Sequence, residues 1–199
     1  NPDFEAPGPD ATPSGWQALG TGYESRRTTE RPYSGQAAAR LTFTGQDRSA
    51  RTAGTLAQSA SAEPYRGRRI RLSGAVRSPA GGASLWLRVD GAGGRMLYLD
   101  NMDDRPVRSD DWTRVEILAD VPAEAERLSL GLLQRGAGEA FVDAVVLEDL
   151  GPANPGAEAA RALTARETDN LAAFARAFGY VRYFYAGDTA AGADWNAVA

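Results

Sequence analysis

The stretch LWLRVDGAGGRMLYLDNMDDRPV, residues 85–107, alternates apolar and polar side chains on both sides of a glycine-rich turn. Successive side chains of a strand point to opposite faces, so this alternation predicts a β-hairpin with one face in a core. The inner face is expected to hold Leu85, Leu87, Leu97 and Leu99. The outer face is then expected to carry a mixed aromatic and charged set, namely Trp86, Arg88, Asp90, Tyr98 and Asp100.

Short runs of the same kind fill residues 1–150, about one every dozen residues, and are separated by Gly, Pro and Asx turns. Almost no helical periodicity lies between them. This pattern predicts a mainly β fold, an antiparallel β-sandwich or jelly roll, rather than a parallel sheet with crossover helices. The predicted strands are Trp16–Tyr23, Ala38–Thr44, Gly54–Ser61, Arg69–Arg77, Ser84–Asp90, Arg95–Asp100, Trp112–Ala119, Arg127–Gln134 and Ala140–Leu147.

Three amino acids are missing from the 199 residues: histidine, cysteine and lysine, since every one of the 22 basic residues is arginine. Their absence excludes a Ser-His-Asp triad, a thiol nucleophile, a Ser–Lys dyad and a Schiff base within these residues. The net charge of −4 argues against a nucleic-acid partner, which requires a basic surface. No apolar run reaches the roughly 18 residues of a membrane span.

The pattern changes after residue 150. Residues 151–162 form a Pro/Gly/Ala-rich stretch that we interpret as a linker. Within residues 163–199, Leu171, Phe174 and Phe178 recur at helical spacing and Gly179 is placed to end the helix. We expect the aromatic side chains of this segment to serve packing, on the sandwich or on a domain beyond Ala199: Phe174, Phe178, Tyr183, Phe184 and Tyr185.

Two parts of the sequence resemble known families. The segments NPDFEAPGPDATPSGWQ (1–17) and YSGQAAARLTF (33–43) resemble galactose-binding-like jelly rolls, which include many carbohydrate-binding modules. The segments LWLRVDG, LDNMDDRPV, VPAEAERLSLGLL and GAGEAFVDAV are similar to a module of that superfamily in bacterial multidomain proteins. The segment LTARETDNLAAFARAFGYVRYFYAGDTAAGADWNAVA (163–199) resembles the region leading into bacterial tail-specific (C-terminal-processing-like) serine peptidases.

The peptidase resemblance implies that a catalytic serine and lysine lie in a later domain and that this chain performs no chemistry. Residues 1–150 are then expected to be an accessory module that binds a carbohydrate or polypeptide ligand or docks on the downstream peptidase domain. The chain begins at Asn1 without a leader, so we expect a secreted or periplasmic protein whose signal peptide has been removed.

The outer face of the hairpin is the first candidate site. Sugar-binding sheets combine an aromatic ring with charged groups that hydrogen-bond hydroxyls, which fits Trp86 and Arg88. The adjoining loop NMDDR adds Asn101 and Arg105, since loops on rigid scaffolds often carry function. The alternative is that the aromatic rings are covered by this loop and that Arg105 and the aspartates form a structural ion-pair network.

A structural calcium ion is the second candidate. Galactose-binding-like modules often hold Ca²⁺ where the first and last strands meet, and the residues here that match are Glu5 and Asp143. The pattern often has two adjacent acids in the last strand, whereas Ala144 follows Asp143 here. If present, this ion is expected to stabilise the fold and to have no catalytic task. We expect no cofactor to be required.

Two rival functions remain open from the residues. A glycosidase would use a pair of carboxylates, and Asp90, Asp100 and Glu116 are available, although no pair stands out by spacing. A purely structural spacer would have its outer face buried against a further domain.

Overall fold

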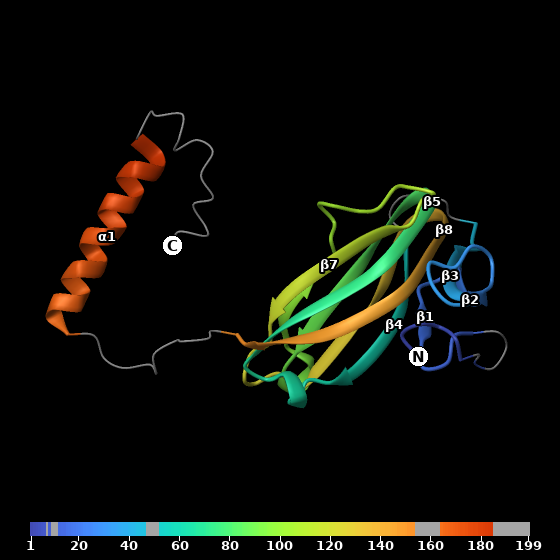
Figure 1. Ribbon diagram of the computed structural model, residues 1–199, viewed down its shortest axis with the longest axis horizontal. Coiled ribbons are helices and arrows are strands. Elements are labelled where there is room, and N and C mark those ends of the chain that lie inside the picture. Colours follow the sequence, from blue (N-terminus) through green and yellow to red (C-terminus); the bar gives the residue numbers. More distant parts are fainter. Residues whose placement is uncertain (7, 9–11, 47–51, 154–163, 185–199) are drawn as a thin grey trace. The chain divides into compact units, whose positions relative to one another are not determined.

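The computed structural model of the chain (Figure 1) describes residues 1–6, 8, 12–46, 52–153 and 164–184. The chain divides into two compact units, Asn1–Pro155 and Gly156–Ala199. The first unit is built from β-strands and the second contains a helix, and each is described by itself.

The described residues of the first unit form eight strands that are linked only by antiparallel pairings, which confirms the predicted antiparallel β fold. Short 3₁₀ turns at Glu63–Tyr65 and Ala92–Gly94 lie between strands. The strands are β1 (Gln17–Leu19), β2 (Tyr23–Thr28), β3 (Ala38–Phe43), β4 (Ala53–Ser61), β5 (Arg68–Asp90), β6 (Met96–Asp100), β7 (Thr113–Asp120) and β8 (Arg127–Pro152).

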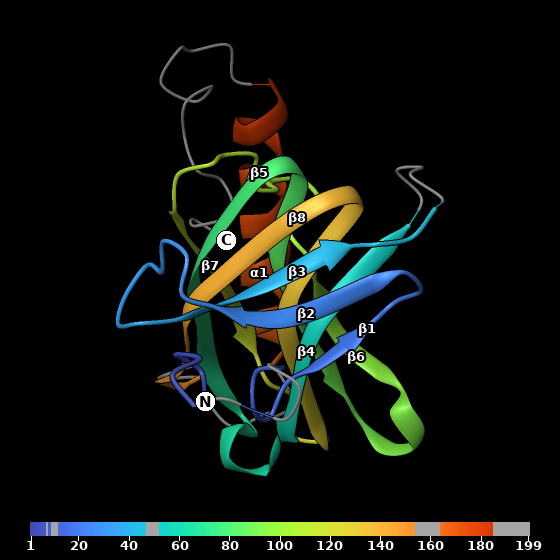
Figure 2. The same cartoon turned by 90° about the vertical axis from the view of Figure 1, so that its right-hand side faces the viewer.

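Strands β5 and β8 are unusually long, at 23 and 26 residues, and pair with each other along nearly their whole length. Four of the predicted strands are therefore parts of these two long strands: Arg69–Arg77 and Ser84–Asp90 lie in β5, and Arg127–Gln134 and Ala140–Leu147 lie in β8. The pairing register shifts between Arg77 and Gly82, opposite Gly136 and Gly138, which both have positive φ. Figure 2 shows both strands curling over at this end of the unit. Glycine permits the bend because it lacks the Cβ that restricts other residues.

The bend divides the continuous sheet into two layers. Residues 127–135 of β8 pair with β4 and with residues 82–90 of β5, and β1 and β6 extend this first layer. Residues 139–149 of β8 lie beside residues 70–80 of β5, and β2, β3 and β7 extend this second layer. One buried apolar cluster contains Leu56, Leu85 and Leu132 of the first layer together with Leu41, Ile70 and Ile117 of the second. The fold is thus a β-sandwich with its core between the two layers.

The predicted strand Trp16–Tyr23 is wrong in its extent, because the chain turns within it. Gly20 and Gly22 have φ angles of +111° and +78°, and they separate β1, which pairs with β4, from β2, which pairs with β3. A Cβ on Gly20 would stand 2.5 Å from the carbonyl oxygen of Ala53. This close approach explains the glycine and brings the first strand to the edge of the first layer.

The second unit contains helix α1 (Ala165–Phe184), which covers the segment expected to be helical. The helix continues through Gly179 rather than ending there; an interior glycine costs only about 1 kcal/mol relative to alanine. The rings of Phe174 and Phe178 stack with centroids 5.9 Å apart. The side chains of Tyr183, Phe184 and Tyr185, like residues 154–162 of the expected linker, lie outside the described residues. Within the part of the chain that the structure describes, no helix has the length and apolar character to cross a membrane.

Candidate functional site

The hairpin of β5 and β6 forms as predicted, but its two strands are offset by a bulge. Paired residues share a face, and the register pairs Leu87 with Asp100, Arg88 with Leu99 and Val89 with Tyr98. Trp86 and Arg88 therefore share the outer face with Leu99, which is 46% exposed, while Tyr98 and Asp100 lie on the opposite face. The expectation that all four polar residues project together is wrong, because the shift between Val89 and Asp90 moves the second strand by one residue.

Trp86 lies in a pocket of about 500 Å³ on the outer face of the first layer. The indole is half-buried, whereas its neighbours Leu85 and Leu87 are wholly buried in the core. Among the described residues, none with a charged side chain lines this pocket. We call it the Trp86 pocket, and its lining residues are Thr12, Pro13, Ser14, Gly15, Trp16, Gln17, Leu19, Ala57, Gln58, Ser59, Trp86 and Ser129.

Strand pairing builds the floor of the Trp86 pocket. Gln17 of β1, Ala57 of β4, Gly131 of β8 and Trp86 of β5 follow one another across the sheet in register. Gly131 lies between Ala57 and Trp86, and a Cβ there would stand 1.9 Å from the carbonyl oxygen of Leu56. Ala57 and Gly131 therefore place no bulky side chain between Gln17 and the indole of Trp86.

The walls of the Trp86 pocket carry uncharged hydrogen-bonding groups. The hydroxyls of Ser59 and Ser129 lie 2.9 Å apart, and the Gln58 amide donates to the carbonyl of Gly15 at 3.2 Å. The buried Nε1 of Trp86 has no hydrogen-bond partner among the described residues. Trp16 is structural in contrast, since it is buried against Phe4 and its Nε1 donates to the carbonyl of Asn1 at 2.9 Å.

Arg88 and Asp90 form an ion-pair cluster beyond the Trp86 pocket. The Nε of Arg88 donates to Asp90 Oδ1 at 2.7 Å, and Arg127 of β8 donates to Asp90 Oδ2 at 3.2 Å. Asp90 is only 2% exposed. Both of its oxygens are therefore occupied by arginine, and the cluster borders the site rather than offering a free carboxylate.

The other polar residues of the hairpin and its following loop form hydrogen bonds with one another or with β7. Arg105 donates to Asp100 at 2.6 Å and to Asp104 at 2.7 Å, and these hydrogen bonds with Asp100 and Asp104 raise the pKa of the Arg105 guanidinium. Asn101 donates to Asp103 at 2.8 Å. The Tyr98 hydroxyl donates to the carbonyl of Leu118 in β7 at 3.0 Å, and burial is the main cause that raises its pKa. The pairs of Arg105 with Asp100 and Asp104 correspond to the ion-pair network of Arg105 and the aspartates that was the alternative interpretation.

Glu5 and Asp143 both accept hydrogen bonds from the turn at residues 33–37. Asp143 is wholly buried and its oxygens accept the amides of Ser34 and Ala144 at 2.9 and 2.6 Å. Burial raises the pKa of Asp143, and Glu5 adds a smaller increase. Glu5 Oε1 accepts the amide of Gln36 at 2.8 Å.

Asp143 has no ion pair with any described residue, although both of its oxygens accept backbone amides, and Arg27 lies 3.6 Å from Glu5. Among the described residues no group of three acidic side chains is placed to hold a metal. Calcium takes six to eight oxygen ligands, so backbone carbonyls and water would have to complete the shell around Glu5 and Asp143. The calcium ion stays a prediction.

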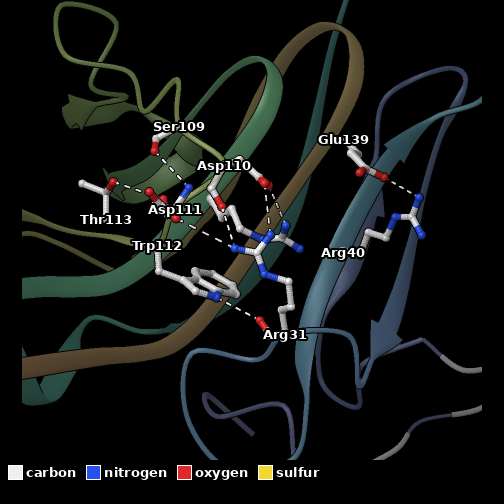
Figure 3. Close-up of polar contacts among 9 residues, drawn as sticks. Arg31, Arg40, Ser109, Asp110, Asp111, Trp112, Thr113 and Glu139 are labelled. Carbon is white, nitrogen blue, oxygen red and sulfur yellow. Dashed lines mark hydrogen bonds and ion pairs between the residues drawn. The ribbon is translucent and has the colours of Figure 1, made fainter.

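The outer face of the second layer carries ion pairs between arginine and acidic residues. Asp110 accepts hydrogen bonds from Arg31 at 3.0 Å and from the buried Arg77 at 2.9 Å, and these bonds lower the pKa of Asp110. Figure 3 shows Asp110, Arg31 and the indole of Trp112, which donates to the carbonyl of Arg31, together with the pair of Arg40 and Glu139. The guanidinium of Arg77 also lies 3.8 Å from the centroid of the Phe141 ring. This cluster fastens the loop after β2 to the start of β7.

Sequence reasoning singled out Trp86 as a candidate but did not single out the other residues that line its pocket. Ser59 and Ser129 come from strands 70 residues apart in the chain. The signal available was a lone hydroxyl within the apolar run LSLGLL and a glycine two residues later. Neither residue could be linked to Trp86 before the pairing of β4, β8 and β5 was known.

No family model matches the chain. A curated relative is an uncharacterized HTH-type transcriptional regulator, YbfP, from Bacillus subtilis (strain 168), which is 36% identical over 104 residues. The match covers 51% of this chain and 35% of the relative, so the chain spans about a third of the length of that protein. The expected relation to tail-specific serine peptidases is therefore wrong, because this relative is named as a transcriptional regulator and not as a peptidase.

Solved structures with the same fold include carbohydrate-binding modules and a phage tailspike domain. The CBM22-1 xylan-binding domain of Paenibacillus barcinonensis Xyn10C is 18% identical with a TM-score of 0.53, covering 72% of this chain and 91% of that one. The C-terminal family 22 module of Clostridium thermocellum Xyn10B is 14% identical with a TM-score of 0.53, covering 73% and 92%. The enzymatically active domain of bacteriophage CBA120 tailspike protein 4 is 14% identical with a TM-score of 0.55, covering 69% and 20%. These likenesses confirm the β-sandwich fold.

Proposed function

We propose that residues 1–153 are a non-catalytic module that binds a carbohydrate in the Trp86 pocket. The observation that carries this proposal is an indole beside hydroxyl and amide groups in a pocket of about 500 Å³, whose described lining residues bear no charge. An aromatic ring offers an apolar surface to the C–H face of a sugar ring, while hydroxyls and amides hydrogen-bond its hydroxyl groups. A pocket without charge suits a neutral sugar.

Two further observations support a binding module rather than an enzyme. The acidic residues of the first layer that could serve a glycosidase are already engaged, since Asp90 is held by two arginines and Asp100 by Arg105. Xylan-binding modules of family 22 share the fold over most of their length, which makes xylan a reasonable first ligand to test. Secretion and the calcium ion are further proposals from the sequence.

Binding to polysaccharides tests the proposal. Affinity electrophoresis in gels containing xylan, or other soluble neutral polysaccharides, is expected to retard the protein, and calorimetry with the matching oligosaccharide then gives the dissociation constant. Trp86→Ala is expected to weaken binding at least about tenfold, because it removes the stacking surface.

Two controls separate loss of binding from loss of folding. Trp86→Phe keeps an aromatic ring in the half-buried position and is expected to keep part of the affinity. Leu99→Ala alters an exposed side chain on the same face outside the pocket and is expected to bind as the parent does. Full affinity in Trp86→Ala would contradict the site, and peptide binding without any glycan binding would replace the carbohydrate with a polypeptide.

A further inference from the structure

A second pocket lies on the same outer face as the Trp86 pocket. It has a volume of about 540 Å³ and includes Gly82 and Ser84 of β5, Arg135 of β8, and Asp103 and Arg108 of the loop between β6 and β7. We call it the Arg108 pocket. Gly82, Ser84 and Trp86 are alternate residues of one strand, so they face the same side of the sheet. At about 3.3 Å per residue, Gly82 and Trp86 are separated by about 13 Å along β5.

The Arg108 pocket differs from the Trp86 pocket in charge. Arg135 donates to Asp103 Oδ1 from both Nε and Nη2, at 2.9 and 2.6 Å, so this pair is neutral as a whole. Arg108 has no hydrogen bond, ion pair or ring contact with any described residue. The pocket therefore carries one uncompensated positive charge.

The Arg108 guanidinium lies close to the backbone of β5 at Gly82. A Cβ on Gly82 would stand 3.5 Å from both Cζ and Nη2 of Arg108 and 3.6 Å from Cβ of Pro106. The guanidinium thus lies against the backbone of β5, close to the sheet face, instead of extending away from the surface. An arginine held against a sheet with its donors free is arranged to receive a carboxylate, because the guanidinium fork matches the two oxygens of that group.

We infer that the Arg108 pocket binds a carboxylate carried by the same glycan, so that the ligand is an acidic oligosaccharide containing a uronic acid. This inference rests on the proposed function of the Trp86 pocket. A neutral sugar stacks on Trp86, and a uronate farther along the same oligosaccharide pairs with Arg108. The two pockets then select a class of polysaccharide that neither would select alone.

The test compares one polysaccharide in two forms: xylan substituted with glucuronic acid, and the same polymer after its carboxylates have been reduced to alcohols. The parent protein is expected to bind the acidic form about tenfold more tightly, the effect of one charge-assisted contact. Arg108→Ala is expected to bind both forms with the affinity that the parent has for the reduced form. Arg71→Ala, which removes an arginine from the outer face of the second layer, is the matched control and is expected to keep the preference.

The outcomes separate the inference from the function on which it rests. Equal binding of both forms by the parent, or a preference that survives in Arg108→Ala, overturns the inference and leaves the Trp86 site standing. Failure to bind either form overturns both. Equal tight binding of inorganic phosphate or free glucuronate by the parent and by Trp86→Ala would show that Arg108 recognises a small anion rather than a glycan. The preference is also expected to weaken as salt rises, because Arg108 is exposed.

Discussion

The outer faces of the two layers use similar backbone geometry for different purposes. On the second layer, arginines pair with carboxylates across neighbouring strands, as in Arg69 with Asp120 and Arg71 with Glu148 at 2.7 and 2.9 Å. On the first layer, the same kind of position is filled by Trp86, Gly131 and Ala57, with an arginine, Arg108, that pairs with no described residue nearby.

The contrast shows which outer-face side chains have no internal partner among the described residues. Paired charges on the second layer satisfy one another, so a ligand would have to displace an existing contact to bind there. The indole of Trp86 and the guanidinium of Arg108 make no such contacts with the described residues, and a ligand can bind them without breaking an internal interaction. Three predictions test this difference between the layers.

Gly131→Ala is expected to cause the largest loss of stability, because the added Cβ disrupts the pairing of β4 and β8 at the floor of the Trp86 pocket. The added Cβ would meet the backbone of Leu56 and Ala57, which cannot move aside as a flexible side chain can. We expect a loss of about 2–4 kcal/mol in the free energy of unfolding, measured by urea denaturation, and weaker sugar binding. Gly74→Ala in β5 is the control: its nearest neighbours are at 3.5 Å, so stability should stay within about 1 kcal/mol. Equal stability of the two variants would contradict the close approach of β4 and β8.

Acidification is expected to lower the stability of the fold through the carboxylates of the second layer, without changing the uncharged described lining of the Trp86 pocket. Hydrogen bonds from Arg31, Arg69, Arg71 and Arg68 lower the pKa values of their partners Asp110, Asp120, Glu148 and Asp149. A carboxyl with a lowered folded pKa stabilises the fold above its ordinary value of 3.8 or 4.5, and this stability is lost as pH falls through the folded pKa. The melting temperature should therefore fall below about pH 4.5.

The described lining residues of the Trp86 pocket include no titratable group, so binding of a neutral sugar should be unchanged at any pH where the protein is folded. Asp143 acts in the opposite sense during acidification, since its pKa is raised by burial and its protonation favours the folded state. A sugar affinity that follows the melting temperature would contradict the separation of the two faces.

Calcium is expected to have the smallest effect. An ion held by Glu5 and Asp143 with a dissociation constant near that of extracellular modules would add about 1 kcal/mol at 1 mM Ca²⁺, or a few degrees in melting temperature. Differential scanning fluorimetry with Ca²⁺, Mg²⁺ or EDTA measures this shift, and Asp143→Asn should abolish it. The shift should shrink at low pH, where the proton competes at Asp143. An identical melting temperature in all three solutions would show that the hydrogen bonds from the 33–37 turn and Arg27 suffice.

The sequence predicted the class of fold because alternation is a local property. The strands of the hairpin, the apolar inner positions Leu85 and Leu87, and the outward direction of Trp86 all follow from a period of two. The face of Tyr98 and Asp100 could not be predicted, since the bulge at Val89 is decided by cross-strand pairing. The same holds for the continuity of β5, because whether Pro79–Gly82 is a turn or a bend depends on the strand opposite it.

The pocket around Trp86 was unpredictable for a related reason. Its walls come from the segments near residues 12–19, 57–59 and 129, which meet only through the pairing of β1, β4 and β8. The family relation of residues 163–199 failed differently: a run of aromatic residues on a helix is common, and resemblance over so short a segment does not identify a peptidase.

Because β5 and β8 run through both layers, neither half of the sandwich is a separate folding unit. The ladder joins Arg68 to Pro152 at one end and Asp90 to Arg127 at the other, so most of its contacts close long loops before any core can form. Such a topology makes for slow, all-or-none assembly. Once the fold is assembled, a force applied at Trp86 is shared by β5 and β8, which run through both layers, instead of separating one layer from the other.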